Sequence, residues 1–391
     1  MPWRDVRPMD EKVLFIADYL RRTDSVSGLC SRYGISRKTA YKWIRRYTEG
    51  GAEALDDASR RPMTSPERVP YEVRQAVIEL RQSQRVPLGP KKIQALLRTR
   101  YPDRPAPSKT TLYKILKTAG LVEPQRRHRR VIHHPQPFAP VDGPNEVWSA
   151  DFKGQLPLGN GAWCYPLTIM DHASRYLLAC EGLEGTRGRE SRRVFDALFR
   201  AYGLPRRIRT DNGVPFATTG PGGLSRLAIW WIRLGIYPER IKPGKPQQNG
   251  RHERMHRTLK RAVSSPVARD MAHQQERLDH FREDYNDCRP HEGLEQRCPS
   301  AVYQPSSRPY PTTLPEPEYP RHFIVRRVGV NGVANWQGLR GYAGYLLGNE
   351  LMGLEQIEDG QWAAYFGPVR LGVFDERQVG GKSGDYMRLN V

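Results

Sequence analysis

Residues 146–153 read EVWSADFK, and this stretch decides the fold of the middle of the chain. Its side chains alternate as in a β-strand, with apolar Trp148, Ala150 and Phe152 on one side. The other side carries Val147, Ser149, Asp151 and Lys153. An aspartate in an apolar-flanked strand is costly to bury unless something compensates its charge, such as a metal ion. Asp151 is therefore a candidate metal ligand.

The residues that follow predict a mixed α/β domain. A hairpin is expected over 165–180, with Asp171 as a turn residue, and an amphipathic helix fits 190–202. A further strand over 207–210 ends at Asp211, which is followed by Asn-Gly. This order of strand, hairpin, helix and strand is that of a ribonuclease-H-like fold.

A third acidic residue lies on a helix further along the chain. A Gly- and Pro-rich loop at 241–246 leads to a helix from about Gln247 to Val263. On this helix Glu253, Arg257 and Lys260 are spaced i, i+4 and i+7 and share one face. One carboxylate would therefore lie beside two cations.

Each of these residues also has an ordinary structural interpretation. Asp211 before Asn-Gly could form a turn, and Glu253 could pair with Arg257 on the helix surface. His252 and His256 are spaced i, i+4 on the same helix, but zinc is disfavoured because no further ligands at a suitable spacing accompany them.

The first 58 residues predict three short helices with a helix-turn-helix arrangement. Ser36 is the expected N-cap of the last helix, whose apolar residues from Ala40 to Tyr47 share one face. A helix near 27–33 precedes it across a Gly-containing turn. The outer face would enter the DNA major groove, although an ordinary solvated basic helix is the alternative. The candidate DNA contacts on that face are Arg37, Lys38, Lys42, Arg45 and Arg46.

Residues 67–124 repeat this pattern. An apolar stripe covers 73–80, and a second one follows the expected N-cap Ser108, with Lys109 and Lys114 facing outward. Two such modules in tandem would read a longer DNA site than one alone. A basic run then follows, which either tracks DNA phosphates or is simply solvated. It consists of Arg126, Arg127, Arg129 and Arg130.

The charge distribution supports a nucleic-acid partner. The 391 residues include 63 Lys and Arg against 42 Asp and Glu, a net charge of +21. Residues 1–140 carry 29 basic and 14 acidic residues, whereas residues 301–391 carry nine of each. A polyanion docked at the basic front of the chain is the expected partner, and a membrane surface is the weaker alternative. The absence of a long apolar stretch, a signal-peptide layout and paired cysteines predicts no membrane association and a cytoplasmic, nucleoid-associated protein.

Four stretches resemble the landmarks of one known family. WSADFKG, RTDNGVPF, KPGKPQQNGRHERMHRTLK and YNDCRPHEGLEQRCPSAVY are similar to those of DDE transposases of bacterial insertion sequences, which share a catalytic core with retroviral integrases. The resemblance covers about 142–304 and implies that Asp151, Asp211 and Glu253 form the catalytic triad. It implies two Mg²⁺ ions, for which Mn²⁺ can substitute, with Asp151 bridging both, Asp211 holding one and Glu253 the other.

The fold class that follows is multidomain, with boundaries set by two Pro-rich stretches at 134–145 and 305–320. We expect all-α helix-turn-helix units at 1–58 and 67–124, the second of them winged-helix-like, an α/β core with a mixed sheet at 142–304, and a small all-β, SH3-like barrel at 321–391. In the core, further DNA contacts are expected from Lys153, Lys242, Lys245, Arg254, Arg257 and Lys260. The Gly-rich segment 217–223 makes the spacing between the second and third acids longer than is usual in the family, which points to a loop insertion.

The predicted function is DNA transposition. The protein would bind the terminal inverted repeats of a mobile element, cleave to give 3′-hydroxyl ends and join these to target DNA, working as a homo-oligomer on double-stranded DNA. The aromatic tail, behind its Pro-rich linker, is the expected assembly surface, unless its aromatics only fill its own core. A non-catalytic DNA-binding regulator and a ribonuclease-H-like nuclease without strand transfer are the alternatives.

Overall fold

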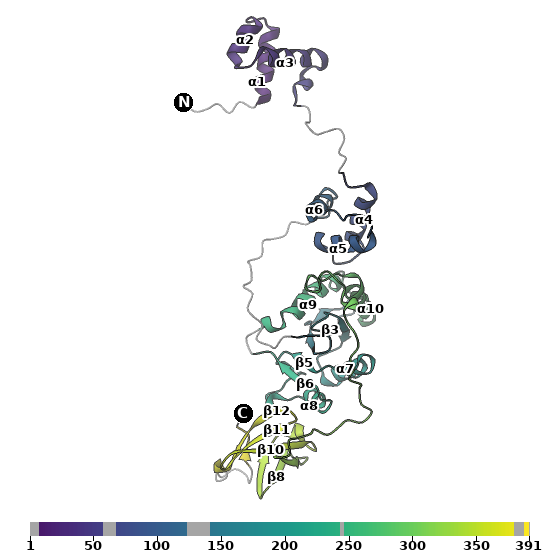
Figure 1. Ribbon diagram of the computed structural model, residues 1–391, viewed down its shortest axis with the longest axis vertical. Helices are drawn as coiled ribbons and strands as arrows, with labels where there is room; N and C mark the ends of the chain where they lie inside the picture. Colours follow the sequence, from purple (N-terminus) through teal and green to yellow (C-terminus); the bar gives the residue numbers. More distant parts are fainter. Residues whose placement is uncertain (1–7, 58–67, 123–140, 243–245, 379–386, 391) are drawn as a thin grey trace. The chain divides into compact units, whose positions relative to one another are not determined.

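The computed structural model describes residues 8–57, 68–122, 141–242, 246–378 and 387–390. The chain forms two compact units, residues 1–68 and 69–391. The second helical stretch, the α/β core and the β-rich tail, which were expected as three domains, all lie in the second unit (Figure 1). Among the described residues, no helix has both the length and the apolar character needed to cross a membrane.

The first unit is helical, as predicted. It contains α1 (Pro8–Leu20), α2 (Val26–Tyr33), α3 (Arg37–Gly50) and a 3₁₀ turn (Ala52–Leu55). The Ser36 side chain accepts a hydrogen bond from the Thr39 N–H, which confirms the predicted N-cap. Gly34 ends α2 in the left-handed conformation, so the chain can turn sharply into α3. The apolar faces meet in a small core around Phe15, Leu29 and Trp43.

The second unit begins with α4 (Tyr71–Gln82), α5 (Pro90–Arg100) and α6 (Lys109–Thr118). The predicted stripes at 73–80 and behind Ser108 both pack into their common core, and Ser108 caps α6. The sequence analysis did not identify α5. This helix begins with Pro90, which is favourable in the first turn, and its Ile93 and Leu97 complete the core.

A mixed six-stranded sheet forms the centre of the α/β core. Its strands are β1 (Val147–Phe152), β2 (Leu156–Pro157), β3 (Trp163–Asp171), β4 (Leu177–Leu183), β5 (Arg207–Thr210) and β6 (Tyr237–Arg240). β3 pairs antiparallel with β1 and β4, whereas β5 pairs parallel with β1 and with β6. The mixed sheet was predicted, but β6 was missed because Pro238 argues against a strand; β6 pairs only with β5, and such an edge tolerates proline.

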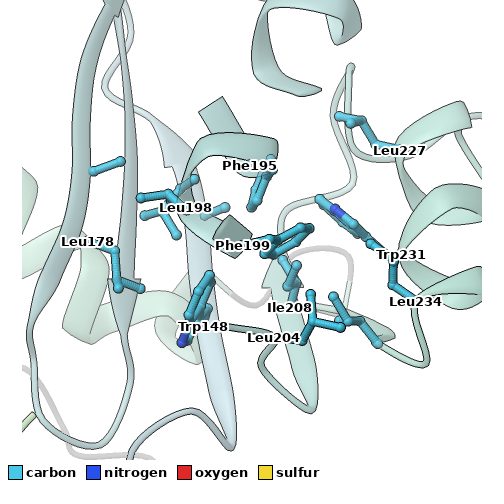
Figure 2. Close-up of a cluster of buried hydrophobic side chains, with 14 of the residues drawn as sticks. Trp148, Leu178, Phe195, Leu198, Phe199, Leu204, Ile208, Leu227, Trp231 and Leu234 are labelled. Carbon is cyan, nitrogen blue, oxygen red and sulfur yellow. The ribbon is translucent and has the colours of Figure 1, made fainter. Parts of the chain in front are cut away.

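Helices cover both faces of this sheet. On one face lie α7 (Gly188–Tyr202) and α8 (Arg226–Arg233), and Phe199 of α7 packs against Trp148 of β1 in a large aromatic core (Figure 2). On the other face lie α9 (Gly250–Val263) and α10 (Met271–Glu283). The predicted alternation along β1 is confirmed, because Trp148, Ala150 and Phe152 all contact the aromatic core.

The tail is an all-β domain of two sheets. One sheet has the order β12 (Val369–Asp375), β11 (Gln361–Phe366), β10 (Leu351–Glu358) and β7 (Ile324–Arg327), and the other β13 (Met387–Arg388), β9 (Leu339–Tyr342) and β8 (Val333–Trp336). The β8–β9 hairpin was not predicted; its Gln337-Gly338 turn has positive φ at both positions. The sequence pattern of the tail also predicts a strand over 343–347, which is wrong, because Tyr345–Leu347 is a 3₁₀ turn after Gly344.

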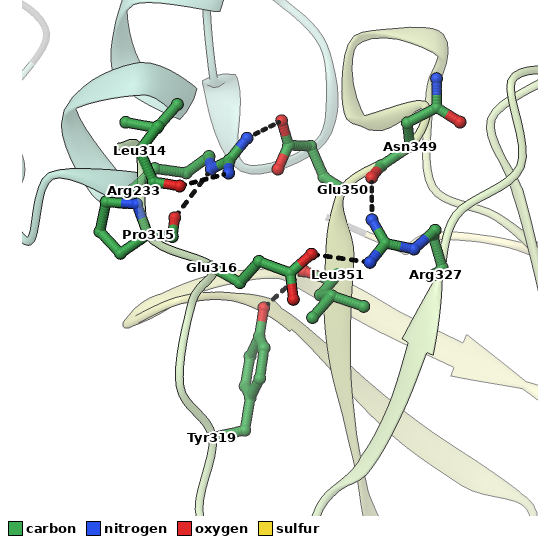
Figure 3. A network of polar contacts seen from close by, with 9 residues as sticks. All are labelled: Arg233, Leu314, Pro315, Glu316, Tyr319, Arg327, Asn349, Glu350 and Leu351. Carbon is green, nitrogen blue, oxygen red and sulfur yellow. Dashed lines mark hydrogen bonds and ion pairs between the residues drawn. The ribbon is translucent and has the colours of Figure 1, made fainter. Parts of the chain in front are cut away.

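The tail packs on the core of its own chain. Ile229 and Ile232 of α8 belong to the same apolar cluster as Trp336, Trp362 and Phe374 of the tail. Arg233 donates to the carbonyls of Leu314 and Pro315 and pairs with Glu350 at 3.5 Å, which fixes the joint from the polar side (Figure 3).

The packing of the tail bears on two expectations. Most aromatic side chains in the described part of the tail fill its own core, which is the alternative to an assembly surface, whereas Tyr345 is 71% exposed. The Pro-rich segment 305–320 does not hang free as a connector, because Arg308 donates to carbonyls of Pro205 and Leu234, and Tyr310 contacts Phe199 in the core. Gly222 of the predicted loop insertion lies against Leu371 of the tail. The insertion and the Pro-rich segment therefore both hold the tail on the core.

Candidate active site

Asp151 and Asp211 are brought together by the parallel pairing of β1 and β5. The register pairs Ser149 with Arg209, so two further residues along each parallel strand place the two aspartates side by side. Both lie at the carboxyl ends of these strands, where ligands bind in open α/β sheets. The Asp151 side chain is 22% exposed, so it faces solvent only partly.

The electrostatics of Asp151 report its neighbours. Burial, then the negative charge of Asp211 and, least, that of Glu253 raise the pKa of this carboxyl to about 7, against the opposing effects of the Phe152 backbone and Lys153. A carboxyl whose pKa is raised by neighbouring acids either holds a proton or shares a cation with them. The three acids predicted as a triad are thus electrostatic neighbours, although they come from β1, the end of β5 and α9.

The local structure of each acid is simple. Asp211 accepts a hydrogen bond from the Gly213 N–H at 3.1 Å, so it also forms the turn that was considered as its alternative role. Glu253 is exposed in the first turn of α9, and no ion pair joins it to Arg257, although the structure describes both residues. Asn249, just before α9, places its amide Nδ2 3.5 Å from Oδ2 of Asp151.

Two buried histidines of α9 support the strand that carries Asp151. Nε2 of His252 and Nε2 of His256 each lie 2.7 Å from Oγ1 of Thr168, which donates to the main-chain carbonyl of Asp151. Nδ1 of His256 lies 3.7 Å from Oδ2 of Asp151. Burial lowers the pKa of His252 to about 3 and that of His256 to about 2, so both imidazoles are neutral at physiological pH.

This arrangement was not predicted from the sequence. No third ligand was expected beside the histidine pair, whereas ligand atoms of His252, His256 and Asp151 all lie within 4.8 Å of one another. The i, i+4 spacing indicated that the rings share a face, but the sequence did not show that this face covers β1. Asp171, expected in a turn, is fully buried and accepts hydrogen bonds from Asn145 and Ser174.

The predicted DNA contacts occupy several surfaces. Arg37, Lys38, Lys42 and Arg45 are exposed on α3, whereas Arg46 is half-buried over the Trp43 ring. Lys109 and Lys114 are exposed on α6. In the core, Lys153 is close enough to influence Asp151, Lys242 is exposed, and so are Arg254, Arg257 and Lys260 of α9. Lys245 and the basic run Arg126, Arg127, Arg129 and Arg130 lie outside the described residues.

Comparison with protein families decides the nature of the core. Two family models described as an integrase core domain match residues 141–246 and 234–299, and together they span all three acids. Residues 141–299 are thus similar to an integrase core domain. Upstream of it, a helix-turn-helix domain model matches residues 11–63 and a homeodomain-like domain model matches 39–116.

Two similar proteins come from bacterial insertion elements. The insertion element IS407 uncharacterized 31.7 kDa protein of Burkholderia multivorans is 30% identical over 191 residues, which are 48% of this chain and 66% of the relative. The IS476 uncharacterized 39.2 kDa protein of Xanthomonas euvesicatoria is 29% identical over 237 residues, 59% of this chain and 64% of the relative. The chain thus spans just under two thirds of the length of these relatives.

Retroviral integrases are found among similar solved structures. The simian T-cell lymphotropic virus intasome in complex with PP2A regulatory subunit B56 gamma covers 71% of this chain and 93% of its own, with 17% identity and a TM-score of 0.36. The HTLV-2 integrase catalytic core domain in complex with magnesium covers 41% of this chain and 98% of its own, with 13% identity and a TM-score of 0.33.

Proposed function

We propose that this protein is a DNA transposase that cleaves and joins DNA with Asp151, Asp211 and Glu253 as its catalytic acids. One observation carries the proposal: Asp211 lies beside Asp151 at the carboxyl ends of two paired parallel strands, and the negative charges of Asp211 and, more weakly, of Glu253 raise the pKa of Asp151. In a purely structural cluster, cations would lie between the acids and lower their pKa values. Here the cation with the largest effect on the pKa of Asp151 is Lys153, and burial and Asp211 raise that pKa by more than Lys153 lowers it.

The donor set suits magnesium. Mg²⁺ prefers carboxylate oxygens and keeps several waters, which a partly exposed cluster of acids at a sheet edge allows. Asp151, Asp211 and Glu253 would together hold two Mg²⁺ ions, for which Mn²⁺ would substitute. When bound, the ions activate the attacking oxygen and stabilise the leaving oxygen of an in-line phosphoryl transfer.

The chain's own residues would orient the DNA and hold the acids. In the first step, the oxygen of water attacks a phosphorus at the element end, the P–O3′ bond breaks, and the products are a 3′-hydroxyl and a 5′-phosphate. In the second step, that 3′-hydroxyl attacks a target phosphodiester, forming a new P–O3′ bond while the target's own 3′-hydroxyl leaves. Lys153, Arg257 and Lys260 would neutralise DNA phosphates beside the acids, and His252 and His256 would keep Asp151 in position.

The helical parts would select the DNA. Exposed cations on α3 and α6 suit the major groove and its phosphates at the terminal inverted repeats. Coordinated cutting of two ends requires two active sites, so we propose that the protein works as a homo-oligomer on DNA. Since the tail packs on the core of its own chain, we propose that Tyr345, which is exposed in the described part of the tail, is available for such assembly.

The test uses a labelled element-end fragment, a target plasmid and Mg²⁺. Asp151→Asn, Asp211→Asn and Glu253→Gln should each lower cleavage and joining at least ~1000-fold, while end binding stays within about threefold of wild type. Glu276→Gln, on the exposed side of α10, is the matched control and should retain activity. Substantial cleavage by any of the three variants contradicts the assignment. Cleavage without joined products would assign a nuclease instead of a transposase, and end binding without cleavage by wild type would assign a regulator.

A further inference from the structure

A second cationic site lies on α9, on a different face from Glu253. Arg251, Arg254 and Thr258 follow one another at i, i+3 and i+7 and line a pocket of about 290 Å³. Residues from α5, from the β3–β4 turn and from the segment after α10 complete it. These are Lys92, Arg175, Arg289, His291 and Glu292, together with Met255, Tyr285 and Gly293.

The charges in this pocket are unbalanced. Five cations line it against a single carboxylate, that of Glu292. That carboxylate is already paired with Lys91, whose Nζ lies 2.6 Å from its Oε1. Within the part of the chain that the structure describes, none of the five cations forms an ion pair with an acid. The pocket therefore concentrates positive charge without an internal counter-ion.

Hydrogen bonds to the main chain hold the arginines of this pocket in place. Nη1 of Arg175 and Nη1 of Arg251 both donate to the carbonyl of His172, and Nη1 of Arg289 donates to that of Val86. The other guanidinium N–H groups of these three arginines have no hydrogen-bond partner among the described residues and can therefore bind a ligand. Nε2 of His291 is buried and has no hydrogen-bond partner among the described residues.

Two further observations show that the cations are held there against a cost. Arg175 has a φ of +64°, a left-handed conformation that favours glycine, yet the chain places arginine at this position. Lys92 has its pKa lowered to about 7 by burial and then by the charges of Arg289 and Arg254. A bound anion would relieve both the burial cost and the mutual repulsion.

The position of the pocket indicates which anion it takes. Lys92 comes from the helical stretch expected to grip DNA, whereas Arg251 and Arg254 come from the helix that carries the catalytic Glu253. Both belong to the second compact unit, and the joint is fixed by hydrogen bonds from Gln84 to the Cys288 carbonyl and from Arg85 to that of Ala262. A duplex passing from the helical stretch to the acids would cross this joint.

We propose that this pocket binds a backbone phosphodiester of the DNA end, at a site separate from the scissile phosphate, and thereby positions the end in the catalytic core. The proposal rests on the proposed function and adds a specific anchoring site to it. The planar guanidinium groups suit phosphate oxygens, which they bind in bidentate fashion.

The test compares full-length variants by fluorescence anisotropy with end DNA across a series of salt concentrations. Arg175→Gly and Lys92→Met should each weaken binding roughly three- to tenfold and reduce the slope of log K against log salt by about 1, the value of one lost phosphate contact. Without DNA, both variants should melt at the wild-type temperature or higher, because each removes a strained or repelling cation. Arg193→Gln, an exposed arginine on α7 outside the pocket, should change neither quantity.

Phosphate-ethylation interference locates the contact. Ethylation of one particular phosphate should weaken DNA binding by wild type but should not weaken DNA binding by the variants any further. Unchanged affinity and slope in both variants overturn the proposal, and so does a large loss of thermal stability in both, which would make the cluster structural. Stabilisation of wild type but not the variants by inorganic phosphate or ATP, with DNA affinity unaffected, assigns a free-phosphate site and also overturns it.

The same samples separate this proposal from the proposed function. If wild type cleaves the end with Mg²⁺ but the variants bind normally, the pocket proposal alone fails. If wild type does not cleave the end, while the variants show the reduced slope of log K against log salt, the proposed function fails and the pocket stands as a DNA phosphate site.

Discussion

Nδ1 of His256 lies 3.7 Å from Oδ2 of Asp151, while Nε2 of the same ring lies 2.7 Å from the hydroxyl of Thr168. The imidazole is thus held between a proposed metal-binding carboxylate and the neighbouring strand. Because its pKa is lowered to about 2, the ring stays neutral and does not compete with a cation for the carboxylate.

We expect His256→Leu to weaken metal binding without removing a catalytic acid. Residues that orient metal-binding carboxylates typically contribute a factor of about 10–100 in metal affinity or activity. The Mg²⁺ concentration for half-maximal cleavage should therefore rise by about that factor, while DNA-end binding in EDTA is unchanged. His280→Leu, exposed on α10, is the matched control. An unaltered Mg²⁺ dependence of His256→Leu would show that the ring does not position Asp151.

Ionised Asp151 should destabilise the metal-free protein. Its pKa is raised from 3.8 to about 7, so as the pH rises between these values the unfolded chain loses its proton first and the stability of the folded chain falls. Asp151→Asn should be more stable than wild type near pH 8 in EDTA, by on the order of a few kcal/mol, and nearly equal below about pH 4. Thermal melts at the two pH values check this. A difference of the same size at both pH values would mean that packing, and not ionisation, is responsible.

Lys92 should give the opposite pH dependence. Its folded pKa, about 7, lies below the unfolded value of 10.5, so the cost of burying its charge is present below pH 7 and disappears as the pH rises between the two values. Arg289 and Arg254 face it and lower its pKa, while Cys298 and Glu292 oppose them. Wild type should gain thermal stability relative to Lys92→Met from about pH 7 to 10. A constant difference over this range would show that Lys92 does not titrate there.

Two neighbouring arginines of α3 should behave differently when neutralised. Arg45 is exposed, and its ion pair with Glu49 is long, at 4.0 Å, and solvent-exposed, so it contributes little to stability. Arg45→Gln should therefore reduce the salt dependence of DNA binding and leave stability unchanged. Arg46 stacks 5.0 Å from the Trp43 ring centroid and contacts the Asp56 carbonyl, so Arg46→Gln should also destabilise the first unit by about 0.5–1 kcal/mol. Salt titrations and chemical denaturation of both variants measure the two effects. Equal stability losses would contradict the distinction.

Elements with strong local signals were predictable from the sequence. The alternation in EVWSADFK placed Asp151 on the face opposite Trp148, and Ser36 marked the start of α3 correctly. Asp151 and Asp211 were predicted on two separate strands, and the parallel pairing of these strands, which was not predicted, brings them side by side; that Glu253 joins them in one site stays a prediction.

Features that depend on distant partners were not predictable. β6 contains Pro238 and is a strand only because β5 pairs with it, and the histidines of α9 acquire their role only from Thr168 and Asp151 across the sheet interface. The docking of the tail on α8 left no periodic signal of its own, because Ile229 and Ile232 read simply as part of an apolar helix. The cationic pocket is likewise assembled from four separate segments, none of which stands out alone.

The shared cluster of α8 and the tail has a consequence for synthesis of the chain. Ile229 and Ile232 leave the ribosome long before Trp336, Trp362 and Phe374, which cover them. At about 5–20 residues per second, this apolar face waits on the order of ten seconds for its cover. During that interval the nascent core exposes an apolar surface that a chaperone can cover. A chain truncated before the tail would expose that surface permanently. Loss of the tail would thus cause aggregation of the newly synthesised protein before it could act on DNA.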